Sequence, residues 1–190
     1  MDYAISILLG ISLAASCGFR VFVPLLVTNI GSLSGWVHLG GGFEWMGTWL
    51  SFAIFLTATI IEIAAYYIPW LDNALDTIAV PLASVAGTLL TVSFIADFPP
   101  GIQWAIGIVA GGGTAAIIKT AAGAVRLGSS AVSGGFTNWI VATVEHIVSI
   151  IMSVLSFFIP IVTGIGAILI FAFCAIKLVK RFRKKPAAQV

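Results

Sequence analysis

Residues 57–77 read TATIIEIAAYYIPWLDNALDT, and this stretch decides how the rest of the chain is interpreted. Its first half is apolar enough to enter a bilayer, yet it contains Glu62. A carboxylate inside an apolar span costs about 2.5–3.5 kcal/mol to insert. After Pro69 the stretch continues with Asp72 and Asp76, so it holds three of the chain's seven acidic residues. This concentration of charge predicts where a functional site lies, without naming a substrate.

The composition excludes an ordinary soluble domain. The chain is 60% hydrophobic and only 8% charged, whereas soluble domains are about 25% charged. We therefore predict an all-α protein, a polytopic bundle of transmembrane helices. Six of the nine basic residues lie in the tail 177–190, which is typical of a cytoplasmic segment that contacts lipid headgroups. The expected location is a bacterial inner membrane with the C-terminus in the cytoplasm, and no nucleic-acid partner is predicted.

Residues 1–176 are predicted to form a single transmembrane domain of about six spans. The apolar run 4–30 allows two interpretations, one tilted helix or a helix that ends near Cys17 and is followed by a partly inserted piece through Pro24. The glycine-rich segment 119–135 is either a cytoplasmic loop or a re-entrant element. Six full spans would place both termini on one side of the membrane. The remaining spans are expected at 47–67, 77–96, 103–118, 136–159 and 160–176.

A weak internal repeat relates the two halves of the chain, 4–96 and 102–176. Residues 14–20, AASCGFR, resemble 121–126, AAGAVR, and residues 58–63, ATIIEI, resemble 142–147, ATVEHI. Three spans separate the members of each pair, so the second copy would insert upside down relative to the first. This is the 3+3 inverted repeat of many transporters, whose broken or re-entrant helices form a site near the midplane. Chance similarity between alanine-rich helices is the alternative.

Glu62 and Glu145 are the strongest candidate site residues, because both fall well inside predicted spans. Ionisable groups within a membrane are functional by default, and this pair would bind a coupling ion or a substrate. Arg20 has no acidic neighbour in its own segment, so we expect it to pair with one of the two glutamates or to hold an anionic group. Tyr66 follows Glu62 by four residues and is the best candidate donor to its carboxylate. The alternative is that these charges only hold helices together.

Asp72 and Asp76 are four residues apart and would share one face of a helix. They either bind a hard cation through oxygen ligands or cap the third span in contact with water, which is the more common role. The identity of any metal is not predicted. The chain lacks a His/Cys metal cluster, a phosphate-binding loop and a nucleophile elbow. We therefore predict neither an enzyme nor a bound cofactor.

Residues 14–25, AASCGFRVFVPL, resemble the opening of a bacterial membrane-protein family known as domain of unknown function 4126. Later segments fit the same pattern: Glu62 before Ile68–Pro69, then Asp72 and Asp76, then 133–138, SGGFTN, with Glu145 beyond. The resemblance implies a membrane location and a fold, but no activity. The basic tail departs from the family's pattern. A looser likeness, in residue types alone, is to the DedA-type proteins, whose re-entrant hairpins carry Arg, Pro and Gly and which move phospholipids or lipid-linked phosphates.

Three functions are compatible with these patterns. The first is a small transporter or ion-coupled carrier that uses Glu62 and Glu145, with Arg20 as the counter-charge. The second is a DedA-like protein that moves anionic or phosphate-bearing lipids through elements around Arg20 and Arg126. The third is a structural or assembly protein whose buried charges lock helices. The expected partners are membrane lipids, an unidentified ion or small solute and, through a small-residue face at Gly107 and Gly111, a second copy in a homodimer.

Overall fold

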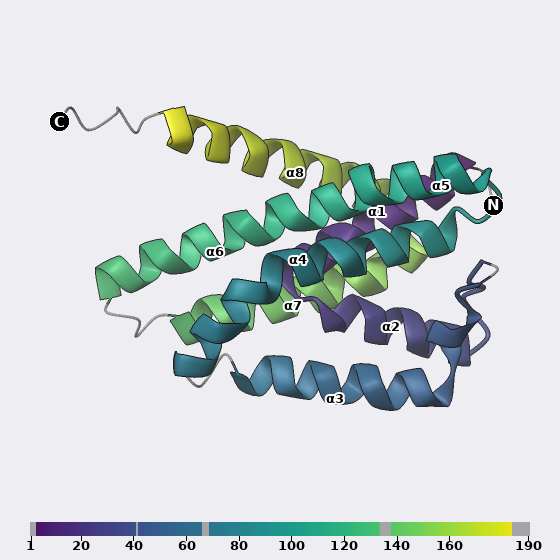
Figure 1. Ribbon diagram of the computed structural model, residues 1–190, viewed down its shortest axis with the longest axis horizontal. Coiled ribbons are helices and arrows are strands. Elements are labelled where there is room, and N and C mark those ends of the chain that lie inside the picture. Colours follow the sequence, from purple (N-terminus) through teal and green to yellow (C-terminus); the bar gives the residue numbers. More distant parts are fainter. Residues whose placement is uncertain (1–2, 41, 66–68, 134–137, 184–190) are drawn as a thin grey trace.

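The computed structural model describes residues 3–40, 42–65, 69–133 and 138–183, and all regular structure in these ranges is helical. The chain is thus an all-α membrane bundle, as predicted (Figure 1). Three of the described helices are long and apolar enough to cross a bilayer, and four shorter ones are apolar. The helical elements are α1 (Tyr3–Phe19), α2 (Phe22–Leu33), η1 (Glu44–Gly47), α3 (Trp49–Ala65), α4 (Pro69–Phe94), α5 (Pro100–Ile106), the π-helical η2 (Gly107–Gly112), α6 (Gly113–Ser133), α7 (Asn138–Phe158) and α8 (Pro160–Arg183).

The first apolar run forms a hairpin of two helices, which confirms the broken-helix alternative. The chain leaves the helical conformation at Arg20 and Val21, between α1 and α2. Pro24 explains the break, because it has no N–H and its ring would clash with the Arg20 carbonyl in a continuous helix. In the first turn of a new helix the same proline is tolerated, because the N–H groups of that turn have no intrahelical acceptor and no hydrogen bond is lost.

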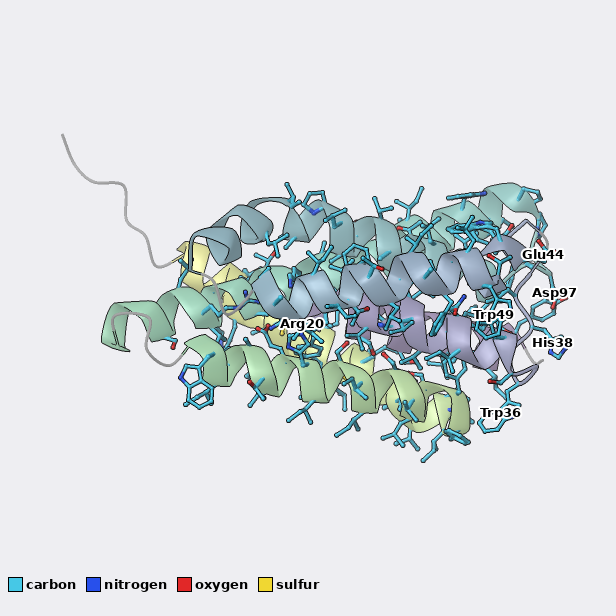
Figure 2. The ribbon with its side chains drawn as sticks, turned by 90° about the horizontal axis from the view of Figure 1, so that it is seen from below. Arg20, Trp36, His38, Glu44, Trp49 and Asp97 are labelled. Atoms are coloured by element: carbon cyan, nitrogen blue, oxygen red, sulfur yellow. The ribbon has the colours of Figure 1, made fainter. Side chains whose placement is uncertain are left out.

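Both outer ends of the hairpin lie at one end of the bundle. The ring of Tyr3, at the start of α1, packs 4.9 Å from the ring of Phe98, just after α4. The ring of Trp36, after α2, lies 6.4 Å from that of Phe158, the last residue of α7. We call this end of the molecule the Trp36 end. The tip of the hairpin, at Arg20, lies part-way along the bundle, away from its Trp36 end (Figure 2).

The longer elements run along most of the bundle. They are α4, the continuous run α5–η2–α6, α7 and α8, whereas α3, with 17 residues, covers only part of this length (Figure 1). Because the hairpin returns to the end from which it entered, α1 begins at the Trp36 end whereas α8 finishes at the opposite end. We call this opposite end the Lys180 end. The two ends of the chain thus lie at opposite ends of the bundle, whereas six full spans would bring both to one end, because the hairpin turns back part-way.

Two expected boundaries also change. Segment 119–135 was expected as a loop or a re-entrant element, but α6 continues as a helix through Ser133. The third span was expected from residue 77, but α4 already begins at Pro69 and places Pro81 in its interior. Neither Gly123 nor Gly128 stops α6, because a single glycine costs a helix only about 1 kcal/mol. Proline and glycine therefore mark helix boundaries less reliably here than the sequence pattern suggested.

Helix α1 lies at the centre of the bundle and packs against α4, α6, α7 and α8. Leu9, Leu13 and Cys17 of α1 belong to the main core, and both cysteines are free thiols. The small-residue face expected to join two copies is used inside one copy. A side chain at Gly107 would meet Val92 of α4, and one at Gly111 would meet Thr91. These glycines let η2 approach α4 closely, so they no longer argue for a homodimer.

Candidate functional site

The hairpin tip places two helix ends inside the bundle, where each has unpaired backbone groups. Such groups must find partners within the protein, because no water is present at this depth of a bilayer. Glu62 of α3 accepts hydrogen bonds from the backbone N–H groups of Val21, at 2.9 Å, and Phe22, at 3.1 Å. Lys119 of α6 donates to the Phe19 carbonyl at 3.2 Å. The carboxylate thus faces the positive end of α2 and the ammonium faces the negative end of α1.

A buried ion-pair cluster lies beside the same break. The Nη2 atoms of Arg20 and Arg126 lie 2.9 Å and 2.8 Å from one oxygen, Oε2 of Glu145. Arg20 is fully buried, and Nη2 of Arg20 also donates to the Ala142 carbonyl at 3.0 Å. Three segments distant in sequence, the hairpin tip, α6 and α7, are therefore tied together through one carboxylate. Figure 2 shows Arg20 within the bundle, away from the labelled residues of the Trp36 end.

Local helix geometry positions these groups. Lys119 and Arg126 are seven residues apart, which places them on one face of α6 two turns apart. Ala142 and His146 are one turn apart on α7, and His146 Nδ1 lies 2.7 Å from the Ala142 carbonyl. Sequence reasoning did not count Lys119 and His146 as site residues. The seven-residue spacing between Lys119 and Arg126 could have identified Lys119. In a helix this spacing places both side chains on one face, so Lys119 would lie on the same side as Arg126.

A seam of serines runs along the contact between α1 and α7. Ser149 donates to the Ser16 carbonyl at 3.1 Å, and Ser153 donates to the Ser149 carbonyl at 2.7 Å. Ser149, Ser153 and Ser156 are fully buried. The serine hydroxyls donate to backbone carbonyls, and their small side chains let α1 and α7 pack closely. The seam also places polar atoms between the ion-pair cluster and the Trp36 end.

A cavity of about 840 Å³ occupies the Trp36 end. Its lining residues on the hairpin include Leu9 and Val27, and its aromatic wall includes Phe94 and Phe157. Trp36, His38 and Asp97 also line it, and Figure 2 shows them together at this end. The cavity therefore extends from the Trp36 end toward the hairpin tip, but Arg20, Arg126 and Glu145 do not line it.

A second cavity, of about 240 Å³, lies beside Glu62. Its other lining residues are apolar and come from the hairpin tip, α3 and α4. They are Val21, Phe22, Ala58, Ile61, Leu75, Ala79 and Leu82. Glu62 is its only charged lining residue, and the carboxylate is held on the backbone of the hairpin. This cavity gives the tip apolar space into which it could shift.

The structure unites some of the predicted site residues and not others. Arg20 pairs with Glu145, one of its two expected partners, and Arg126 joins them. Glu62 lies next to this cluster but binds backbone N–H groups. Tyr66 lies outside the described residues. Asp72 and Asp76 lie in the first turns of α4, but their side chains lie outside what the structure describes.

Metal chemistry finds no additional support in the described part of the chain, where no three His, Cys, Asp or Glu side chains gather. The arrangement at the hairpin tip is suited instead to binding and releasing a charged group. Two guanidinium groups and one carboxylate form a cluster whose members come from the hairpin tip, α6 and α7. A buried cluster of this kind gains little net stability over apolar packing, but it is costly to leave half-formed.

Comparison with known proteins gives a family and no activity. No curated protein and no solved structure matches this chain. The likeness to DedA-type proteins therefore stays a prediction from residue types. A family model described as "Domain of unknown function (DUF4126)" matches residues 7–181, which include the hairpin, Glu62, Arg126 and Glu145. Because this match spans nearly the whole chain, the protein belongs to the DUF4126 family.

Proposed function

We propose that this protein is a small membrane transporter that moves a charged solute by alternating access around the hairpin tip. The observation that carries the proposal is the break between α1 and α2, which is held inside the bundle by Glu62, Lys119 and the Glu145 cluster. Transporters use discontinuous helices in this way, and irregular backbone at membrane depth is tolerated where protein or a cavity surrounds it. A purely structural bundle has no need of such a break.

The two ends of the molecule support a particular working state. The 840 Å³ cavity leads inward from the Trp36 end. Between its floor and the Lys180 end, the Arg20–Glu145–Arg126 cluster ties the hairpin to α6 and α7. In our proposal the structure is open toward the Trp36 end and closed by this cluster. Separation of Glu145 from the two arginines would free the tip and open the other side, a discrete change of the kind that packed helices allow.

The helix directions agree with an inverted repeat for only one of its two matched pairs of segments. Helix α3 begins at the Trp36 end and α4 returns to it, whereas α7 ends there and α8 departs from it. The pairs α3–α4 and α7–α8 thus run in opposite directions, as an inversion between halves 4–96 and 102–176 requires. In the other pair, α1 and α6 both run away from the Trp36 end, which an inversion does not allow (Figure 1). The matched residues Arg20, Glu62, Arg126 and Glu145 nevertheless gather around one break.

The distribution of charge favours a bacterial inner membrane with the Lys180 end in the cytoplasm. The described basic side chains outside the buried cluster, Lys177 and Lys180, lie near the end of α8, whereas Glu44 and Asp97 lie at the Trp36 end (Figure 2). Basic residues concentrate on the cytoplasmic side of membrane proteins. The 840 Å³ cavity would then open to the outside. A homodimer remains a prediction that no described contact addresses.

The lipid-moving alternative rests on one specific observation, the lining of the large cavity. Aromatic and aliphatic side chains dominate this lining, and Trp36 and Phe158 beside it are strongly exposed. Such a wall accepts an acyl chain as readily as a hydrated solute. Under this alternative the arginines of the cluster would receive an anionic headgroup, while the chains remain against the apolar wall.

The test is transport by the purified protein in liposomes. The assay follows proton, potassium, phosphate and sulfate movement in parallel with the flipping of a labelled anionic phospholipid. Arg126→Gln removes one ion pair of the cluster, and Glu44→Gln, at the exposed start of η1, is the matched control. We expect transport by the wild type and the control and its loss in Arg126→Gln, with Arg126→Gln still folded by circular dichroism. Lipid flipping alone would favour the second function. Absence of any movement in all three proteins would contradict both and favour a structural role.

A further inference from the structure

Glu145 occupies a site that is built for an anion. Two guanidinium groups, from Arg20 and Arg126, converge on its single oxygen Oε2 at 2.9 Å and 2.8 Å. Convergent arginines recognise carboxylate, phosphate and sulfate oxygens through charge-assisted hydrogen bonds. A cation coming to the same oxygen would have to approach between two positive groups, so the geometry disfavours a coupling-ion site at Glu145.

The groups around Arg20 and Arg126 also favour an anion. Lys119 adds a third buried cation, and its ammonium lies on the Phe19 carbonyl at the same break. Glu62, the other buried carboxylate of the described residues, already accepts two backbone N–H groups of the hairpin. At low dielectric these charges act strongly on any ion that enters. The described cluster thus offers positive groups to a ligand and uses its negative groups to hold the helices.

We propose that Glu145 is an internal substitute for an anionic ligand, which displaces it from Arg20 and Arg126. This inference rests on the proposed transport function and names the class of its substrate. The ligand would carry a phosphate, sulfate or carboxylate group, either as a free anion or as a lipid headgroup.

The exchange would couple binding to movement. Glu145 belongs to α7, and its ion pairs tie α7 to the hairpin tip and to α6. A ligand that takes its place leaves the two arginines satisfied but breaks both ion pairs to α7, so that of the described links only the hydrogen bond from Arg20 to the Ala142 carbonyl remains. A ligand can shift a conformational equilibrium only by its difference in affinity for the two states. Here the ligand competes with Glu145 in the closed arrangement but not in the open one. The ligand therefore binds the open arrangement more tightly.

The test measures binding of inorganic phosphate and sulfate to the purified protein by thermal shift and by calorimetry. Glu145→Gln removes the internal competitor, so we expect both anions to bind at least about tenfold more tightly than to the wild type. Glu145→Asp, whose shorter side chain reaches the arginines less well, should give an intermediate gain and serves if Glu145→Gln does not fold. Glu44→Gln should bind as the wild type does, and Arg126→Gln in the Glu145→Gln background should remove the gain.

A second arm identifies the source of the anion. The same variants are compared in nanodiscs of phosphatidic acid and of phosphatidylcholine. Stabilisation of Glu145→Gln by phosphatidic acid together with tight binding of phosphate would assign a lipid headgroup, whereas tight binding of the inorganic anions alone would assign a free anion. Equal or weaker anion binding by the two Glu145 variants would overturn the inference. If the protein fails this binding test but transports a cation, the proposed transport function stands and only the anionic substrate is rejected.

Discussion

The hairpin α1–α2 and the continuous run α5–η2–α6 show how two apolar stretches of similar length reach different structures. Both contain small residues and a buried arginine, Arg20 in one and Arg126 in the other. The first breaks at Arg20 and turns back, whereas the second runs from Pro100 to Ser133 and passes through a π-helical segment at its glycines. The length of an apolar run therefore does not decide whether it crosses the bundle.

The difference comes from where the backbone finds its hydrogen-bond partners. Pro24 prevents the first stretch from continuing as one helix, and Glu62 and Lys119 satisfy the ends that the break creates. In the second stretch no proline lies after Pro100, and Gly107 and Gly111 bring the backbone close to α4 instead. One stretch uses distant charges to stabilise an interruption, and the other uses close packing to remain whole.

The largest expected effect follows from breaking the ion-pair cluster at the hairpin. Arg20→Gln would leave the buried Glu145 with one of its two guanidinium partners, and we expect a loss of about 3 kcal/mol in the free energy of unfolding. Unfolding in mixed detergent micelles measures this loss. Lys177→Gln, on α8, is the control and should change little. Adding Glu145→Gln to Arg20→Gln should recover part of the loss, and a double variant no more stable than Arg20→Gln would contradict the coupling.

An intermediate effect is expected in the continuous run. In Gly111→Ala the new Cβ would lie 2.6 Å from the Gly87 carbonyl oxygen and 2.8 Å from Thr91 Cβ. Because Gly87 contributes backbone that cannot move aside easily, we expect destabilisation of about 1–3 kcal/mol. Gly113→Ala meets nothing within 4 Å and should be neutral or stabilising by up to about 1 kcal/mol. Equal thermal stability of these two variants would show that close packing does not hold this run.

A smaller effect is expected from the cap on the hairpin. Glu62→Gln replaces one oxygen with an NH₂ group that faces a backbone N–H of Val21 or Phe22, so one charge-assisted hydrogen bond is lost. We expect a cost of about 1–2 kcal/mol. The same substitution at Glu44, whose carboxylate accepts from Gly42 on an exposed loop, should cost less than about 0.5 kcal/mol. Chemical unfolding of both variants measures the two losses in the free energy of unfolding. Equal losses would show that the Glu62 carboxylate does not stabilise the hairpin.

Much of the fold was predictable from composition and proline positions. The helical membrane class and the break near Cys17 were confirmed, as was the pairing of Arg20 with a glutamate. The direction of α2 was not predictable, because an apolar segment of 12 residues gives no sign of which way it runs. Nor was the role of Glu62, because its partners are backbone N–H groups that any sequence could supply. Lys119 was expected in a loop or a re-entrant element, because nearby glycines suggested one where α6 continues.

Thiol labelling across the membrane tests the central claim, that the α1–α2 hairpin enters and leaves by one face. Single cysteines replace Tyr3, Trp36 or Lys180 in a Cys174→Ser background, with buried Cys17 retained and the parent protein as the control. A membrane-impermeant maleimide is applied to intact cells and to inverted vesicles. We predict that Tyr3→Cys and Trp36→Cys react from the same side and Lys180→Cys from the other. Reaction of Tyr3→Cys from the side of Lys180→Cys would mean that the first element crosses the membrane, and would contradict the re-entrant hairpin.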